Sequence, residues 1–343
     1  MALKRTGKTA DLEPGDPWTH ALRVTAPALA LAPTSFIADL RAGFEAEGLS
    51  AAVLAHDSAR LSDWLMRHVG LQGISDAAAY CYTAQHGNAT WEAVQASLAS
   101  EPSCPRLRSY WALEGYRYRK AARTCSEPRH WLRCPLPALP LRKGSLNVAA
   151  FGMALFIRDA CGGDLVGWID RRLSEADPGH GAAGRGPRLR DAIMDPLQGI
   201  GGIGPKLLTM LFADLLLAAD PDRERWVTAG SWMVAVDSLV HNYLHRTGVL
   251  SRFGAEHTYG PACVAPCGCR DLIEGLAQRI DARAINPGFP AVFPRFVQAA
   301  LWAFCAADVW NVCNGNRIDD QYRCQQATCP AYANCDRVSL RPS

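Results

Sequence analysis

Apolar residues recur every three or four positions along most of the chain, which is the spacing of helices that bury one face. Good helix formers fill the same stretches. Together they predict helices over residues 35–47, 58–68, 90–99, 106–124, 147–160, 206–219, 235–247, 269–282 and 293–312. The alternation typical of strands is scarce, and only residues 20–31, with Pro27 inside them, offer a weak β-like pattern. The chain is therefore expected to be all-α.

Three stretches interrupt this pattern and are expected to be loops. Residues 128–143 contain four prolines, which cannot sit inside a helix. Residues 175–187 are rich in glycine and are typical of a flexible linker, and residues 254–268 form another irregular segment. Because 343 residues exceed what one core usually holds, we expect two lobes.

Composition narrows the function only slightly. Apolar residues make up 49% and charged residues 20% of the chain, as in ordinary globular proteins. The net charge of +3 permits binding to nucleic acid but does not require it. The N-terminus lacks the apolar core of a signal peptide, and the apolar run at residues 207–217 contains Asp214 and is too short to span a bilayer. We therefore expect a soluble intracellular protein, in the cytoplasm or nucleoid.

Residues 199–206 read GIGGIGPK, a turn with almost no side chains between two predicted helical stretches. In such a turn the N–H groups of Gly202, Ile203 and Gly204 can point outward, where a phosphate oxygen also meets the positive end of the next helix. Pro205 suits the first position of that helix, because its missing N–H needs no partner there. The turn could bind a DNA phosphate without reading sequence, or it could be an ordinary connection between helices.

The stretch LQGIGGIGPKLLTMLFADL, followed by MVAVDSLVHNYLHRTG, resembles the helix-hairpin-helix DNA glycosylase superfamily typified by endonuclease III. Residues 202–206 match the family's Gly-Val-Gly-x-Lys hairpin, and residues 236–240 match its Val-Asp-x-x-Val. Residues 115–121 resemble its Gly-x-x-x-x-Lys-Ala. The three motifs occur in the family's order. With the cysteines, the resemblance reaches from about residue 63 to residue 335.

The resemblance implies two helical lobes that flank a DNA-binding cleft. It divides the chain into an N-terminal extension whose helices pack on the C-terminal lobe (residues 1–62), a helical barrel domain with the hairpin (63–248) and a C-terminal lobe (249–343) with the cysteine segment 305–335. It also implies a monomer that acts on double-stranded DNA carrying a modified or mismatched base. No membrane partner is expected.

Asp237 and Lys206 are the catalytic residues that the resemblance implies. Loss of a base builds positive charge on the sugar, and the carboxylate of Asp237 would stabilise that charge. An aspartate before a helix is also the usual N-cap. Lys206 would attack the sugar as a neutral amine, a form that partial burial beside Ile203 and Leu207 would favour, and the resulting Schiff base would permit β-elimination. Lys206 could instead only contact phosphate.

The target base must leave the stacked duplex for a pocket, and a side chain must fill the gap. Gln85, in TAQHG, resembles the family's wedge residue, although a surface loop is an equal interpretation. Arg117 and Lys120 are interleaved with Tyr116 and Tyr118, a mixture of phosphate-binding charge and aromatic faces. This stretch contacts DNA, or it is a solvated helix face.

Thirteen cysteines are many for an intracellular protein, where thiols or metal ligands are more common than disulfides. The family binds a [4Fe–4S] cluster through Cys-x6-Cys-x2-Cys-x5-Cys. This chain has a similar series of four cysteines near its end: Cys313, Cys324, Cys329 and Cys335. Their last interval equals that of the family pattern, and their first two intervals are longer. They predict a [4Fe–4S] cluster, with zinc and free thiols as alternatives, and Cys305 could replace Cys313. Three further cysteines lie close enough to share a second metal, with no obvious fourth ligand: Cys263, Cys267 and Cys269.

The sequence therefore predicts a DNA glycosylase that flips out and excises a damaged, mismatched or modified base, with β-lyase activity through Lys206. The alternatives are a monofunctional glycosylase in which Asp237 activates water, and a hairpin module that binds DNA without catalysis. Two departures leave the identity of the base open. Gly201 replaces the common hairpin proline, and the segment AADPDRERWVTAGSW lengthens the interval between Lys206 and Asp237. Oxidised, alkylated, mismatched and hypermodified bases, such as viral DNA carries, all remain candidates.

Overall fold

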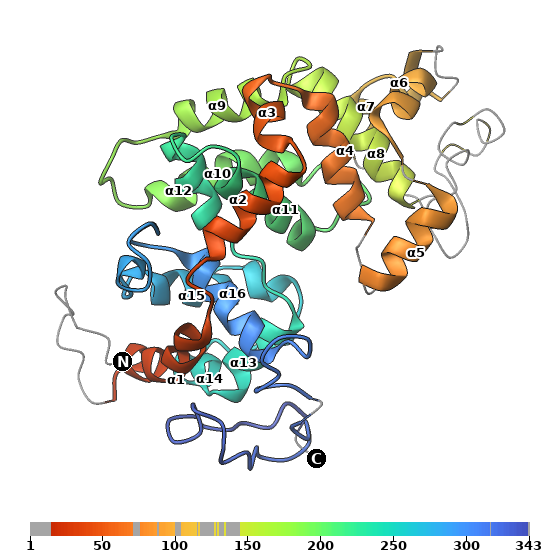
Figure 1. Ribbon diagram of the computed structural model, residues 1–343. Helices are drawn as coiled ribbons and strands as arrows, with labels where there is room; N and C mark the ends of the chain where they lie inside the picture. Colours follow the sequence, from red (N-terminus) through yellow and green to blue (C-terminus); the bar gives the residue numbers. More distant parts are fainter. Residues whose placement is uncertain are drawn as a thin grey trace. The chain divides into compact units, whose positions relative to one another are not determined.

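The computed structural model describes residues 15–70, 76–87, 89–99, 104–114, 116, 127, 129, 134, 145–315 and 317–341. Every regular element in these ranges is a helix and none is a strand, so the all-α prediction is confirmed (Figure 1). The chain divides into unit 1, residues 1–39 and 230–343, and unit 2, residues 40–229. Within the same ranges no single helix is long and apolar enough to cross a membrane. Only α1 (Pro17–Leu31) and α2 (Phe36–Ala46) pass that test together, as a bent pair.

Unit 1 brings the N-terminal helix together with the last part of the chain. α16 lies in its core and packs on α1, α13 and α15. Phe289, Phe293 and Phe296 form an aromatic group in this core, with ring centroids 4.9–5.8 Å apart. Besides α1 the helices of unit 1 are α13 (Ser238–Arg246), α14 (Val249–Arg252), α15 (Cys269–Ala277) and α16 (Pro294–Cys305).

α1 shows that the weak β-like expectation for residues 20–31 is wrong. Asp16 caps the helix, since its carboxylate accepts a hydrogen bond of 3.1 Å from the N–H of Thr19. The buried positions of α1 follow helical spacing and include Ala21, Val24 and Ala28. Burial of this face outweighs the cost of Pro27 inside the helix.

Unit 2 is built around α8 (Ser145–Leu155), which packs on α4, α6 and α7. The side chains of α8 from Leu146 onward are buried on every side, as in a core helix. The other helices of the unit are α3 (Leu49–Leu54), α4 (Ser58–Val69), α5 (Asp76–His86), α6 (Trp91–Ala99), α7 (Tyr110–Leu113), α9 (Leu165–Ala176), α10 (Arg185–Leu197), α11 (Pro205–Ala218) and most of α2 and α12 (Glu224–Ser231).

The glycine-rich linker expected over residues 175–187 is shorter and more constrained than the sequence suggests. α9 extends to Ala176 and α10 begins at Arg185. The guanidinium of Arg185 donates to Asp177 at 2.7 and 2.9 Å and to Glu224 at 2.6 and 2.7 Å. Since Asp177 and Arg185 stand at the two ends of the connection, their ion pair holds these ends together.

The unit boundaries also differ from those expected at residues 62 and 248. Residues 40–62 belong to unit 2, where α4 packs on α8 and α6. Residues 230–248 belong to unit 1, because α13 packs on α16. Lys206 and Asp237, expected in one barrel domain, therefore lie in different units.

Candidate functional sites

The glycine-rich turn of unit 2, residues 198–204, joins α10 to α11. Ile200 and Ile203 are buried and anchor the turn, whereas Gly202 is exposed and has a φ of +84°, which would strain a side chain. A Cβ on Gly204 would meet nothing within 4 Å. Packing therefore does not explain the glycine at position 204, and space remains beside its backbone.

Lys206 is the second residue of α11, directly after Pro205 at the first helical position. Its side chain is exposed, so the partial burial expected beside Ile203 and Leu207 is absent. The N-terminus of a helix carries positive partial charge, which does not stabilise a cation. An anion bound at this point would interact favourably with both the helix and the lysine.

The other predicted DNA contacts are only partly described. Gln85 lies near the end of α5, with an exposed side chain, so it belongs to a helix and not to a loop. Arg117 and Lys120 lie outside the described residues. Tyr116 is only 8% exposed, so its ring does not offer the open aromatic face that the sequence suggested.

In unit 1, Asp237 is the N-cap of α13. Its Oδ1 accepts a hydrogen bond of 2.9 Å from the N–H of Val240, and its side chain is half-buried. The preceding residues, Met233 to Val236, are all buried and hold the start of the helix in the core. The capping function considered for this aspartate is therefore present in the structure. A cap does not exclude a second function, because a carboxylate has further lone pairs.

Tyr259 lies close to Asp237 and was not singled out by the sequence. Its side chain is 49% exposed, and its ring centroid lies 5.9 Å from that of His241. Partial burial and, to a smaller extent, the charge of Asp237 raise the pKa of Tyr259 above its ordinary value. An aromatic face thus lies within electrostatic range of the carboxylate at the start of α13.

The four cysteines predicted to bind a cluster line one cavity in unit 1, here called the C-terminal cysteine cavity: Cys313, Cys324, Cys329 and Cys335. Apolar side chains of the same cavity include Phe304, Ile318 and Ala331. Cys305 is fully buried but is not among the lining residues. The thiols predicted from their C-terminal position are therefore brought together by the fold.

Arg246 places positive charge beside these thiols. It is 3% exposed, lines the cavity and pairs with Asp320. Its Nη1 is buried and has no hydrogen-bond partner in the described part of the chain. A hydrogen bond from the Cys305 thiol and, less strongly, the charge of Arg246 lower the pKa of Cys313, whereas burial raises the pKa of Cys335 to about 12. An anion bound in the cavity would accept a hydrogen bond from the unpartnered Nη1 of Arg246.

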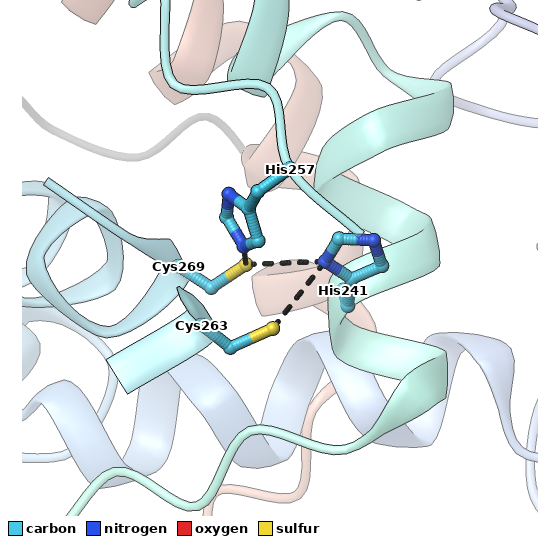
Figure 2. Close-up of side chains that lie close together, drawn as sticks. All are labelled: His241, His257, Cys263 and Cys269. Carbon is cyan, nitrogen blue, oxygen red and sulfur yellow. Dashed lines mark hydrogen bonds between the residues drawn. The ribbon is translucent and has the colours of Figure 1, made fainter. Parts of the chain in front are cut away.

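A second group of ligands, here called the His–Cys group, lies at the other face of α13: His241, His257, Cys263 and Cys269. Their ligand atoms all lie within 4.8 Å of one another and could hold a metal ion. Figure 2 shows the two sulfur atoms directed toward the imidazoles. Burial and, to a smaller extent, the nearby histidines lower the pKa of His241 to about 4, so its ring is neutral at physiological pH. Neutral imidazole is the form that binds metals.

The His–Cys group corrects the weaker metal prediction. Of the three cysteines proposed for a second site, Cys263 and Cys269 belong to the group, whereas Cys267 is exposed and does not. The two further members of the group are His241 and His257, which were not predicted from the sequence. A regular spacing could have revealed His257, because five residues separate it from Cys263 and five separate Cys263 from Cys269, whereas His241 lies outside this spacing.

No family model, no curated protein and no solved structure matches the chain. The resemblance to helix-hairpin-helix glycosylases therefore remains a prediction that rests on its motifs. Any function must be argued from the residues and geometry of the turn, of Asp237 and of the two groups of metal ligands.

Proposed function

We propose that the protein is a DNA glycosylase that removes a modified or mismatched base from double-stranded DNA. The observation that carries the proposal is the turn at residues 198–204. Gly202 is exposed there, space remains beside Gly204, and the second residue of α11 is an exposed lysine. An exposed glycine, a helix N-terminus and a cation together favour a phosphate. Such a contact fixes the DNA backbone without selecting a sequence.

Asp237 supplies the electrostatic part of the reaction. As the base leaves, positive charge develops on the sugar, and a carboxylate beside it lowers the barrier. The hydrogen bond from Val240 fixes the direction of the Asp237 side chain, so the charge is positioned before the reaction begins. Tyr259 offers a half-exposed aromatic face on which an extruded base can stack.

Lys206 is the proposed nucleophile. The chain has 36 lysines and arginines, of which only five are lysines, at positions 4, 8, 120, 143 and 206. An arginine would bind phosphate at least as well, but a guanidinium keeps its proton and cannot attack a sugar. The amine of Lys206 displaces the base at C1′ and loses a proton, and the base leaves with the electrons of the broken bond. Opening of the sugar then gives a Schiff base, from which β-elimination breaks the strand.

Two alternatives are each favoured by one observation. The exposure of Lys206 favours a monofunctional enzyme in which Asp237 activates a water molecule. The capping bond of Asp237 favours a module that binds DNA without catalysis. Release of a base from duplexes that each carry one modified base tests the proposal, since binding to all of them without release would support the module.

The C-terminal cysteine cavity fits a [4Fe–4S] cluster. Its donor set consists of four thiols, and the orphaned Nη1 of Arg246 would face the negative charge of a thiolate-bound cluster. Cys313 is the first ligand in this proposal, because it lines the cavity and Cys305 does not. A bound cluster cross-links the segment after α16, in which the described residues 306–341 form no regular helix.

Iron content tests this assignment. Protein purified without oxygen is expected to be yellow-brown, with about four iron atoms and four sulfides per chain. Cys329→Ser should remove the colour and reduce solubility, because the C-terminal segment loses its cross-link. Cys81→Ser is the matched control, since Cys81 is exposed and lies in unit 2, and it should keep the colour. A colourless, folded wild-type protein would reject the cluster.

Substitutions in the turn test the phosphate contact. Gly204→Ala should leave the melting temperature unchanged, because its φ of −75° suits alanine and the added Cβ meets nothing within 4 Å. It should nevertheless weaken binding to modified and unmodified duplexes alike by about tenfold, because the added methyl group fills the space in which a phosphate would approach the backbone. Fluorescence anisotropy with labelled duplexes measures the effect. A change in which base is removed, with affinity intact, would contradict the assignment of the turn.

A further inference from the structure

The His–Cys group has the geometry of a tetrahedral zinc site, and we propose that it holds a structural zinc ion (Figure 2). Zinc bonds of about 2.3 Å to sulfur and about 2.0 Å to nitrogen, at the tetrahedral angle, separate the two ligand atoms by about 3.5 Å. Nδ1 of His241 lies 3.5 Å from the sulfur of Cys263 and 3.5 Å from that of Cys269. Nε2 of His257 lies 3.4 Å from the sulfur of Cys269.

His257 is oriented as a metal ligand by its second nitrogen. Its Nδ1 lies 2.7 Å from the carbonyl oxygen of Ala255, which can only accept a hydrogen bond, so Nδ1 carries the proton. The lone pair is therefore on Nε2, the nitrogen that faces Cys269. Metal-binding histidines are commonly held by such a hydrogen bond on the side away from the ion.

The backbone between the cysteines is wound tightly enough to bring them together. Cys263 lies in the short 3₁₀ helix η6 (Pro261–Val264), and Cys269 is the first residue of α15. A Cβ on Gly268 would clash with the carbonyl oxygen of Ala262 and approach those of Cys263 and Ala265 to 2.9 Å. Glycine is thus required directly before the second sulfur ligand.

The proposed ion is structural because four protein ligands leave no position open for a substrate. The ligands come from α13, from the segment after α14, from η6 and from α15. Residues 253–268 contain little regular structure, so a metal that joins these segments supplies stability that packing alone would not. Tyr259 lies between His257 and Cys263 in the sequence, so a zinc ion bound to both would also restrain the segment that carries its ring. The zinc site does not depend on the proposed function.

Zinc analysis of the full-length protein, expressed with both zinc and iron in the medium, tests this inference. Elemental analysis should find about one zinc per chain, and zinc X-ray absorption should show two sulfur ligands at about 2.3 Å and two nitrogen ligands at about 2.0 Å. Cys263→Ser should lower the zinc content at least about tenfold. Cys267→Ser, a matched change of an exposed cysteine in the same segment, should leave it unchanged.

The ligand type separates this site from the C-terminal cysteine cavity. A spectrum with only sulfur ligands would place the zinc in that cavity and would overturn the inference. Wild-type protein without zinc, or equal loss of zinc in Cys263→Ser and Cys267→Ser, would also overturn it. The measurement on wild-type protein keeps the test decisive even if Cys263→Ser does not fold.

Discussion

Asp237→Asn is expected to preserve the fold and to abolish base release. The Oδ1 atom of asparagine can accept the same hydrogen bond from the N–H of Val240, and asparagine is as good an N-cap as aspartate. Only the negative charge is lost. Because that charge stabilises the positively charged sugar, single-turnover base release should fall by at least about 100-fold. The assay uses the duplex from which wild-type protein releases a base.

Asp16→Asn is the control for this prediction. Asp16 caps α1 in the same unit, through a hydrogen bond of 3.1 Å from Thr19, so the two substitutions make the same chemical change at the same kind of position. Both variants should keep the wild-type melting temperature, and Asp16→Asn should keep its activity. Normal turnover by Asp237→Asn would leave Asp237 only its capping function, and another group would then have to stabilise the positively charged sugar.

Regular spacing of apolar residues predicted several helices, although α9 and α10, whose buried positions also follow helical spacing, were not predicted. Residues 58–68 and 206–219 were expected as helices and form α4 and α11, with each end within one residue of its predicted position. α1 was missed because a proline and small residues weaken its pattern, and its stability comes from packing on α16, which is far away in the sequence. Local periodicity carries no information about such a contact.

How well each candidate site could be predicted depends on how far apart its residues lie in the sequence. The C-terminal cysteines are close in sequence, and the resemblance to the family's cysteine pattern predicted that they meet at one site. The ligands of the His–Cys group come from four segments, and only the two cysteines that lie near one another were noticed. Tyr259 and Arg246 acquire their importance from neighbours that the fold supplies, namely Asp237 and the C-terminal cysteine cavity.

Lys206→Gln is expected to abolish covalent trapping and strand cleavage together. Borohydride adds hydride to the carbon of a Schiff base and converts it to a stable amine, so wild-type protein and DNA should become one covalent species during turnover. The amide of glutamine cannot form that bond. Denaturing gels of labelled duplex measure both the trapped species and the cleaved strand.

Lys206→Arg separates the nucleophile from a simple phosphate contact. Arginine keeps the positive charge at the start of α11 and binds phosphate, but it remains protonated and cannot attack the sugar. If Lys206 is the nucleophile, the arginine variant should bind DNA as wild type does and lose trapping completely. If Lys206 only contacts phosphate, the arginine variant should keep full activity, and the glutamine variant should flatten the salt dependence of binding by about one unit of slope. Base release by wild-type protein that leaves an intact strand and never traps would assign the reaction to water activated by Asp237. In that case the protein would be a glycosylase without lyase activity.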